Sequence, residues 1–368
     1  MPALPACCAL LALLLLCTLI HAAEPDAPVY PRREALLTLK LPDGSEKLIR
    51  TERDWRRRRE QILANMEKVM GPFPGAEKRV PLDIRIEQEQ RGAQYTWKKL
   101  SFASAPGERV PALLLIPNRL SGPAPAVLAL HQTVKIGKEE PCGLGGSPNL
   151  QYGKELAERG YVVLAPDYPT LGEHAVNVYE RGWVSGSMKA IWDNVRAVDL
   201  LQSLPEVDDR RIGCLGHSLG GHNTLYTAAF EPRIQVAISN CGFTAFSRYY
   251  GGNLTGWMGE RYMPRIRSQY PTPERMPFDF HDVLAAIAPR AVLASAPVRD
   301  GNFEVSGVRE VVSAVAPVYE LLGKGDRLQA IYPDCAHDWP ADAREVAYRW
   351  LDRWLRSKPA ADAPRPKG

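Results

Sequence analysis

One serine in the chain stands among glycines in a pattern that can hold a nucleophile. The stretch RIGCLGHSLGGHN, residues 211–223, carries Ser218 with Gly216, Gly220 and Gly221 around it. An apolar run of strand length precedes the serine and a helical pattern follows it, which is the order that a nucleophile elbow requires. The glycines let strand and helix approach closely while the serine takes a strained backbone conformation. A glycine-rich turn without a catalytic role is the alternative, and we favour the nucleophile.

A serine hydroxyl needs a base within hydrogen-bond reach, and a histidine near the end of the chain is placed to supply it. His337 lies in YPDCAHDWP, a loop between the last expected strand and the last expected helix. His217 and His222 are close to Ser218 in sequence, but we expect their side chains to point elsewhere. His281 is expected at the start of a helix. We therefore predict His337 as the general base.

The histidine in turn needs a carboxylate that fixes its tautomer and stabilises its charged form. The stretch ASAPVRDGNFEV leaves the strand that precedes the histidine loop and carries Asp300 and Glu304. Asp300 is closer to the strand end and is the first choice, while Glu304 remains open as the alternative acid. The predicted catalytic triad is therefore Ser218, Asp300 and His337, in that order along the chain.

The tetrahedral intermediate of acyl transfer needs two hydrogen-bond donors for its oxyanion. The first expected donor is the backbone N–H of Leu219, the residue after the nucleophile. The second comes from the loop after the strand AVLAL, where Thr133 is the first choice and Gln132 the second. Because the backbone supplies this donor, the type of side chain constrains the choice only weakly.

The elements that must position these residues alternate between apolar strands and amphipathic helices. Runs of strand length occupy residues 125–132, 161–168, 211–218, 234–241, 290–298 and 327–334. Helical patterns occupy residues 149–160, 185–204, 219–230 and 344–356. Nearly continuous apolar strands separated by helices indicate a parallel sheet that is covered by helices on both faces.

Additional elements precede this pattern. Residues 51–71 read as one amphipathic helix, which Thr51 begins and Gly71 ends. We expect Trp55, Ile62, Met66 and Val69 on its buried side and the basic run Arg56–Arg59 on a solvated face. A half-exposed strand at residues 82–90 and a hairpin over residues 95–117 follow.

This set of motifs resembles the α/β-hydrolase fold over residues 81–356. Within that superfamily it resembles the branch of dienelactone hydrolases, prolyl oligopeptidases and acetyl xylan esterases, in which extra N-terminal strands are common. The resemblance implies ester hydrolysis through an acyl-enzyme, without a cofactor. Many members have His-Gly-Gly or His-Gly-aromatic where this chain has His131-Gln132-Thr133. Glucuronoyl esterases have an arginine at the position of Leu219, which counts against a close relation to them.

Length and composition are those of an ordinary globular protein, with 368 residues, 45% of them hydrophobic and 24% charged. The small net charge of +4 argues against nucleic-acid binding. An apolar stretch that ends in His21-Ala22-Ala23 predicts an export signal over residues 1–23 and a secreted or periplasmic protein without membrane attachment. The remainder is expected to divide into a helical extension (24–80), the catalytic domain (81–356) and a disordered tail (357–368).

Four cysteines remain beyond the expected signal. Cys214 and Cys241 fall in runs that read as buried strands, where a free cysteine behaves as a small hydrophobic residue. Cys142 and Cys335 lie in loops and are the expected disulfide pair, if an oxidising compartment forms one. No pair has the CxxC spacing of a zinc site, so we expect no metal.

Nearly fifty residues separate the strand that ends at Cys241 from the strand at 290–298, and connections of that length are usually functional. We expect this segment to form a lid or pocket wall with Tyr249, Tyr250, Trp257, Arg261 and Tyr262, although packing against the core is an equal alternative. Lys135 and Lys138 favour an anionic substrate.

The predicted function is a secreted serine esterase that cleaves acetyl or other acyl esters of carbohydrates. A serine peptidase of the oligopeptidase branch and a non-catalytic binding protein are the alternatives. The partner is expected to be a small-molecule or saccharide ester. The acyl group, the alcohol and the oligomeric state are left open.

Overall fold

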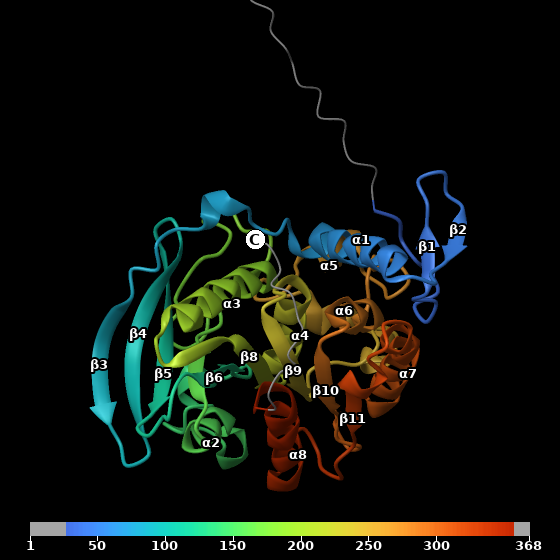
Figure 1. Cartoon of the computed structure of the whole chain (residues 1–368). Helices are drawn as coiled ribbons and strands as arrows, with labels where there is room; N and C mark the ends of the chain where they lie inside the picture. The colour runs from blue at the N-terminus through green and yellow to red at the C-terminus, as the bar shows by residue number, and fades with distance from the viewer. Residues whose placement is uncertain (1–26, 357–368) are drawn as a thin grey trace, which may run out of the picture.

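The structure is a computed structural model that describes residues 27–356. The predicted export signal and the predicted disordered tail lie outside the described residues. Within them, a nine-stranded sheet has the strand order β11-β10-β9-β8-β6-β7-β5-β4-β3 (Figure 1). Its strands are β3 (Arg85–Arg91), β4 (Tyr95–Ala105), β5 (Glu108–Pro117), β6 (Ala124–Leu130), β7 (Val162–Pro166), β8 (Val207–His217), β9 (Ile234–Asn240), β10 (Ala291–Ser295) and β11 (Leu328–Ile331).

The sheet has a parallel part and an antiparallel part. Strands β7, β6, β8, β9, β10 and β11 run parallel to one another, whereas β5, β4 and β3 form an antiparallel meander at the edge that joins β7. Each predicted strand is present within a few residues of its expected position. The prediction of an α/β-hydrolase fold with a mostly parallel sheet is therefore confirmed.

Helices cover both faces because the parallel strands are apolar on both sides. Along β6 the residues alternate between two core clusters, with Leu128 and Leu130 in one and Val127 and Ala129 in the other. Helices α3 (Gly186–Ser203), α4 (Leu219–Phe230), α6 (Phe280–Ile287) and α7 (Val305–Leu321) pack into the first cluster. Helices α2 (Tyr152–Glu158) and α8 (Ala341–Leu351) pack into the second, on the opposite face (Figure 1). The sequence analysis did not anticipate α7.

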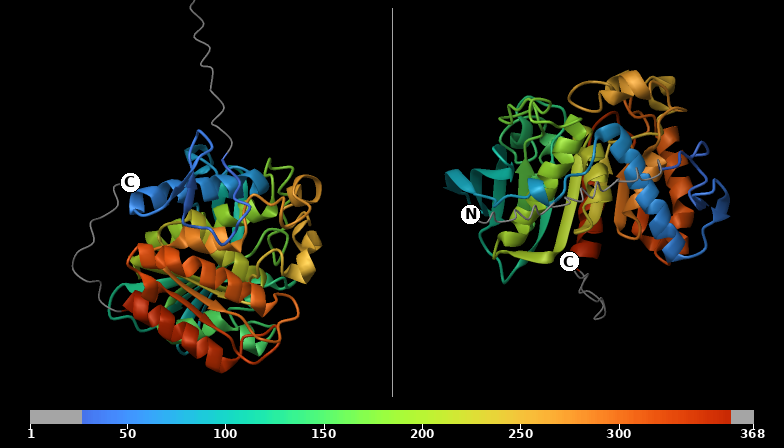
Figure 2. Two further views of the ribbon diagram at one scale, coloured as in Figure 1. Left: turned by 90° about the vertical axis from the view of Figure 1, so that its right-hand side faces the viewer. Right: turned by 90° about the horizontal axis from the view of Figure 1, so that it is seen from above.

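The N-terminal residues pack on the helices that cover the sheet through helix α1 (Glu52–Met70). Thr51 accepts a hydrogen bond from the backbone N–H of Asp54, and Gly71 ends the helix, as predicted. The four apolar residues expected on one side are all buried in the first core cluster. The extension also contains a two-stranded sheet of β1 (Thr38–Lys40) and β2 (Glu46–Leu48), which the sequence analysis missed. In Figure 2, α1 crosses the outside of the helical layer.

The expectation of a solvated basic face on α1 is wrong for two of the four arginines in the run Arg56–Arg59. Arg58 is 1% exposed, and its guanidinium pairs with the carboxylate of Asp282 in α6 at 2.7 Å. Arg59 donates to the carbonyl oxygens of Ala286 and Ala229, in the last turns of α6 and α4. Sequence periodicity could not show this, because a long cationic side chain is buried only where another element supplies its acceptors.

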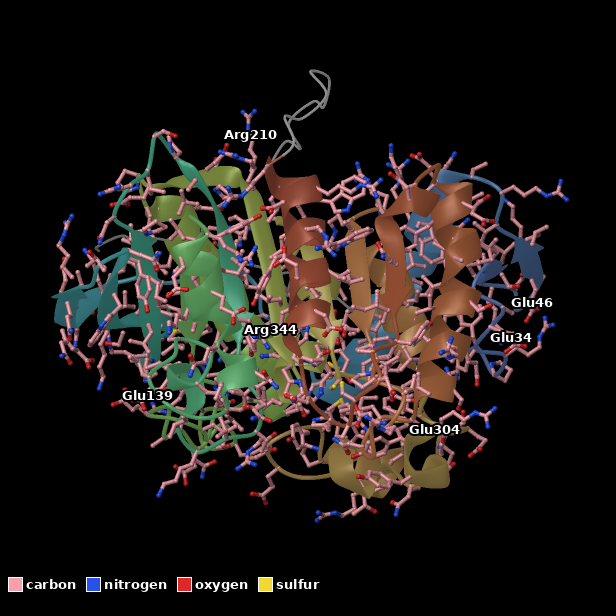
Figure 3. All side chains as sticks on the ribbon, turned by 90° about the horizontal axis from the view of Figure 1, so that it is seen from below. Glu34, Glu46, Glu139, Arg210, Glu304 and Arg344 are labelled. Atoms are coloured by element: carbon pink, nitrogen blue, oxygen red, sulfur yellow. The ribbon has the colours of Figure 1, made fainter. Side chains whose placement is uncertain are left out.

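The carboxyl ends of the parallel strands meet at one edge of the sheet, and the long segment of residues 242–289 projects there (Figures 2 and 3). In Figure 3, Arg210 near the start of β8 marks one end of the sheet, and Glu139 and Glu304 lie at the opposite end. The segment contains η4 (Tyr249–Gly252), η5 (Leu254–Trp257), α5 (Arg265–Gln269) and then α6. Across residues 27–356, no helix is both long enough and apolar enough to cross a bilayer.

The candidate pair Cys142 and Cys335 does not form a disulfide. Cys142, Cys214, Cys241 and Cys335 are all free cysteines, and Cys142 is buried in the core cluster beneath α2. Its loop position in the sequence gave no sign that the side chain points inward.

The buried Arg58–Asp282 pair predicts that the extension contributes to the stability of the whole domain. Replacing Arg58 by alanine leaves the Asp282 carboxylate buried, with the backbone N–H of Asp279 at 3.1 Å and Arg33 at 3.8 Å as its remaining partners. We expect the free energy of unfolding, measured by urea denaturation, to fall by about 3 kcal/mol. The matched control is Arg56→Ala on the exposed side of the same helix, with a change within about 0.5 kcal/mol. Equal losses for the two variants would contradict the buried-pair assignment.

Candidate active site

Ser218 stands at the sharp turn between β8 and α4, with backbone angles φ 55° and ψ −116°. A residue with a side chain holds such a conformation only at a cost of about 1–3 kcal/mol. The neighbouring glycines make the turn possible. A Cβ on Gly220 would lie 1.8 Å from the carbonyl oxygen of Leu130, and one on Gly216 would lie 2.4 Å from the backbone of Gly220. The close packing of β6, β8 and α4 therefore requires glycine at these positions.

Helix α4 presents its first backbone N–H groups beside the serine. Leu219 is the first residue of the helix, and the N–H groups of a first helical turn have no acceptor within the helix. The positive end of the helix dipole lies at the same point. This arrangement suits a developing negative charge next to Ser218. The role of Leu219 as the first oxyanion donor remains a prediction that this geometry supports.

The carboxylate of Asp300 is hydrogen-bonded to the imidazole of His337. Nδ1 of the ring lies 2.9 Å from Oδ1 and 3.0 Å from Oδ2. The backbone N–H groups of Asn302 and Phe303 also donate to this carboxylate, at 2.8 Å and 3.1 Å. Burial alone would raise the pKa of Asp300, but the hydrogen bond and charge of His337 and the two backbone donors hold that pKa below its usual value. Asp300 is therefore anionic and oriented toward the histidine.

Asn240 holds the serine turn and the histidine loop together. Its carbonyl oxygen accepts the backbone N–H of Ser218 at 2.9 Å, and its side-chain amide donates to the carbonyl oxygen of Asp338 at 3.1 Å. The rings of His217 and His337 lie 4.7 Å apart between their centroids. The structure gives no hydrogen bond between the Ser218 hydroxyl and His337, and catalytic hydrogen bonds are often long before substrate binds. The Ser–His step of the triad stays a prediction.

The other candidate residues have different partners. Glu304 is exposed (Figure 3); its carboxylate accepts from the Ser306 hydroxyl, and its carbonyl oxygen accepts from Thr244. His217 is buried and accepts a hydrogen bond from Asn240, and desolvation lowers its pKa to about 3. The structure thus brings Asp300, and not Glu304, to the imidazole of the histidine loop.

His222 and His281 also lie away from that imidazole. His222 packs beneath Trp257, with ring centroids 4.8 Å apart, and His281 is buried in the first turn of α6. Neither contacts the Asp300 carboxylate. The position of His222 agrees with the expectation that it points elsewhere, and His281 lies at the start of a helix, as expected.

The loop after β6 is held by a buried ion pair. The ammonium group of Lys138 lies 2.7 Å from the Asp167 carboxylate and 2.7 Å from that of Glu173, and its side chain is 1% exposed. The backbone N–H of Lys138 donates to the same aspartate. The expectation that Lys138 offers a charge to an anionic substrate is therefore wrong. Its charge fixes the loop that carries Gln132 and Thr133.

The side chains of the two predicted loop donors have their own partners. The amide of Gln132 donates to the Glu140 carboxylate at 3.0 Å and 3.1 Å. The hydroxyl of Thr133 lies 3.0 Å from that of Tyr262. Either backbone N–H remains a candidate for the second oxyanion donor. The contact with Tyr262 links this loop to the segment of residues 242–289.

The aromatic residues predicted for the pocket divide into two groups. Tyr249 and Trp257 are buried and pack against each other and against Phe303, so they belong to an aromatic core. Tyr250 is 59% exposed, and Tyr262 is partly buried beside the loop after β6. Only the second pair is placed to meet a substrate from solution.

Arg261 also bridges the segment to the rest of the domain. Its guanidinium donates to the Thr170 hydroxyl at 3.0 Å, and its carbonyl oxygen accepts from the Tyr168 hydroxyl at 2.9 Å. The segment is therefore anchored along the side of the site that carries the loop after β6.

Sequence reasoning did not identify Asn240, Asp167 or the role of Cys241. Cys241 follows Asn240 directly and lies beside the Asp300–His337 pair. Burial raises the pKa of its thiol well above the usual value, which disfavours the thiolate form in the absence of a ligand. The signal in the sequence was the position of Asn240 and Cys241 at the end of a parallel strand next to the elbow strand.

Comparison with known proteins identifies the family of this chain. The model described as "Prolyl oligopeptidase family" matches residues 149–358, more than half of the chain. "Putative hydrolase YtaP" of Bacillus subtilis (strain 168) is 27% identical over 310 residues, covering 81% of this chain and 99% of the relative. "Carbohydrate esterase MZ0003", from an unknown prokaryotic organism, is 27% identical over 136 residues, 35% of this chain and 32% of that protein.

A solved structure shares the fold. The glucuronoyl esterase from Solibacter usitatus superposes with a TM-score of 0.71 at 21% identity, covering 89% of this chain and 98% of that one. These matches confirm the prediction of an α/β-hydrolase in the branch that includes the prolyl oligopeptidases.

The identity of the triad acid can be tested by two matched substitutions. Asp300→Asn removes the carboxylate that holds Nδ1 of His337, and we expect kcat to fall by about 10⁴-fold because the imidazole then takes the wrong tautomer. Glu304→Gln changes an exposed carboxylate that pairs with Ser306, and kcat should stay within about twofold. A larger loss for the glutamate variant would make Glu304 the acid.

Proposed function

We propose that this chain, which belongs to the prolyl oligopeptidase family, is a serine hydrolase that cleaves carboxylic esters of carbohydrates. The observations that carry the proposal are the hydrogen-bonded Asp300–His337 pair and a serine held at positive φ at the start of a helix, with Asn240 bonded to both the serine turn and the histidine loop. A carboxylate-oriented imidazole next to a strained serine is the arrangement that acyl transfer requires.

The proposed reaction begins with attack of the Ser218 hydroxyl oxygen on the ester carbonyl carbon, while Nε2 of His337 takes the hydroxyl proton. Asp300 stabilises the resulting imidazolium through Nδ1. The oxyanion accepts hydrogen bonds from the backbone N–H of Leu219 and from that of Thr133 or Gln132. The intermediate collapses as the imidazolium gives its proton to the leaving alcohol. Water, activated by the same imidazole, then attacks the acyl-enzyme and releases the carboxylic acid.

Several observations support a carbohydrate ester as the substrate. Relatives of this chain include a carbohydrate esterase, and the fold is shared with a glucuronoyl esterase. Tyr250 and Tyr262 offer aromatic rings with hydroxyl groups on the segment of residues 242–289, and such rings suit the faces and hydroxyls of a sugar.

The acid part of the ester is proposed to be a neutral acyl group such as acetyl. The side chain after the nucleophile is Leu219, which is buried against Tyr168 and Ala190. Lys138 is neutralised by two carboxylates. Neither residue offers a cation to the substrate, which favours an acyl group that carries no free carboxylate.

The first test is hydrolysis of p-nitrophenyl acetate by the purified protein. We expect turnover, and we expect Ser218→Ala to lower kcat by about 10⁴-fold or more because no other group forms the acyl-enzyme. A fluorophosphonate should label the parent protein and not the alanine variant. Absence of both turnover and labelling would point to a non-catalytic binding protein of this fold.

The same preparation distinguishes esterase from peptidase, the candidate that the family match also supports. Acetylated xylo-oligosaccharides and aminoacyl p-nitroanilides should be compared by kcat/KM. Preference for the sugar acetates supports the proposal. Cleavage of the anilides without cleavage of acetates would assign the chain to peptide hydrolysis.

We also propose that residues 1–23 direct export and are removed. In a bacterial host that carries the full-length chain, the protein should accumulate outside the cytoplasm with Glu24 as its first residue, because the apolar stretch ends in Ala22-Ala23. N-terminal sequencing of the exported protein measures this. A mature form that retains the apolar stretch would contradict cleavage.

A further inference from the structure

A third group with metal-binding chemistry lies at the Asp300–His337 pair. Sγ of Cys241, a carboxylate oxygen of Asp300 and a ring nitrogen of His337 all lie within 4.8 Å of one another. Among the residues that the structure describes, this is the one cluster of three histidine, cysteine or carboxylate ligands so close together. The proposed esterase reaction uses the carboxylate and the imidazole but has no step for a thiol.

The thiol is held firmly in this position. Cys241 has φ 50°, a backbone conformation that cysteine rarely adopts, and its N–H donates to the carbonyl oxygen of Ser295 at 2.9 Å. Its sulfur lies 3.3 Å from the side-chain amide of Asn240 and 3.5 Å from the carbonyl oxygen of Asp338. These contacts fix the sulfur between the end of β9 and the histidine loop.

We propose that Cys241, Asp300 and His337 form an inhibitory binding site for a thiophilic divalent cation, with Zn²⁺ as the type case. Zn²⁺ accepts thiolate, imidazole and carboxylate ligands together, and three protein ligands leave a fourth position for water. Metal binding stands on these side chains alone. The inhibition rests on the proposed esterase function.

The distances suit this ion after a small movement. Zinc bonds of about 2.3 Å to sulfur and about 2.0–2.2 Å to nitrogen and oxygen put tetrahedral ligand atoms about 3.3–3.8 Å apart. The Nδ1–carboxylate distances of 2.9 Å and 3.0 Å must therefore widen by about half an ångström. The His337 side chain is 28% exposed and lies in a loop, so it can move, and it opens the site to solvent. Asp300 and Cys241 form the buried side.

Metal binding at this point would block the base itself. The thiol loses its proton to solvent as the S–Zn bond forms. The metal replaces the proton on Nδ1 of His337, and the neutral ring then carries its proton on Nε2. One proton is released to solvent for each metal bound. Nε2 is the atom that must accept the Ser218 proton, so the metal-bound enzyme cannot start acyl transfer.

The chain offers a matched control for the thiol. Cys335 lies two residues before His337 in the same loop, is more exposed than Cys241, and is not one of the three clustered ligands. A metal bound through any accessible thiol would depend on Cys335, whereas the proposed site depends on Cys241. The variants Cys241→Ser, Cys241→Ala and Cys335→Ser therefore separate the two possibilities.

Cd²⁺ titration of the purified protein tests binding without reference to activity, because a thiolate–Cd²⁺ bond gives a charge-transfer absorption in the ultraviolet. We expect one equivalent to produce the band in the parent protein and in Cys335→Ser, and no band in either Cys241 variant. Circular dichroism and melting temperature confirm that each variant is folded. A band that persists without Cys241, or no band in the parent protein, overturns the site.

Inhibition of p-nitrophenyl acetate hydrolysis by Zn²⁺ tests the inhibitory role of the site. The rate of each variant is compared with its own metal-free rate. The half-inhibitory concentration should rise at least tenfold in Cys241→Ser and Cys241→Ala and stay within twofold in Cys335→Ser, and EDTA should restore activity. Equal inhibition of all variants overturns the inhibitory role. If the protein hydrolyses no ester, the proposed function fails while the Cd²⁺ band still decides whether the site exists.

Discussion

The placement of Ser218, Asp300 and His337 depends on the register of four neighbouring parallel strands. His217 of β8 pairs with Asn240 of β9, and Asn240 pairs with Ser295 of β10. The backbone ladder then continues beyond the strand ends, where the N–H of Ser218 donates to Asn240, that of Cys241 to Ser295, and that of Ala296 to Ile331, each at 2.9 Å. Because these bonds fix the strand ends at one level, the turns that follow must emerge side by side.

Backbone hydrogen bonds of the same kind also bring Asp300 next to His337. After β10 the backbone N–H groups of Val298 and Arg299 donate to the carbonyl oxygens of Pro333 and Cys335 in the histidine loop. Asp300 is the next residue, so its carboxylate arrives beside His337 without a long flexible connection. Glu304 lies beyond this paired stretch at the start of α7, where nothing holds it toward the ring.

Much of this arrangement could be predicted from the sequence, because the spacing of apolar residues and the length of an apolar run are local properties of the chain. The strands, the elbow at Ser218 and the first choice of Asp300 and His337 could be predicted for that reason. The partners of buried polar side chains could not. Lys138 was expected to face a substrate, yet its charge lies between Asp167 and Glu173, which come from a strand end and a loop far along the chain. The expectation that Arg58 is solvated was wrong for the same reason, since its acceptor is 224 residues away in sequence.

The backbone pairing between the strands also limits which side chain can occupy position 241, next to Asp300 and His337. The side chain at position 241 must be small, because the Asp300 carboxylate has to reach His337 next to it, and it must tolerate burial. Cysteine meets both conditions as a compact and weakly polar side chain. The three properties that the Asp–His pair requires, which are an anionic carboxylate, a neutral imidazole and partial shielding from water, are also those of a good metal ligand set. A thiol placed there by packing therefore completes a donor set that hydrolysis does not require. The strand register that places Asp300 beside His337 thus also places a thiol there, and the proposed metal site rests on that placement.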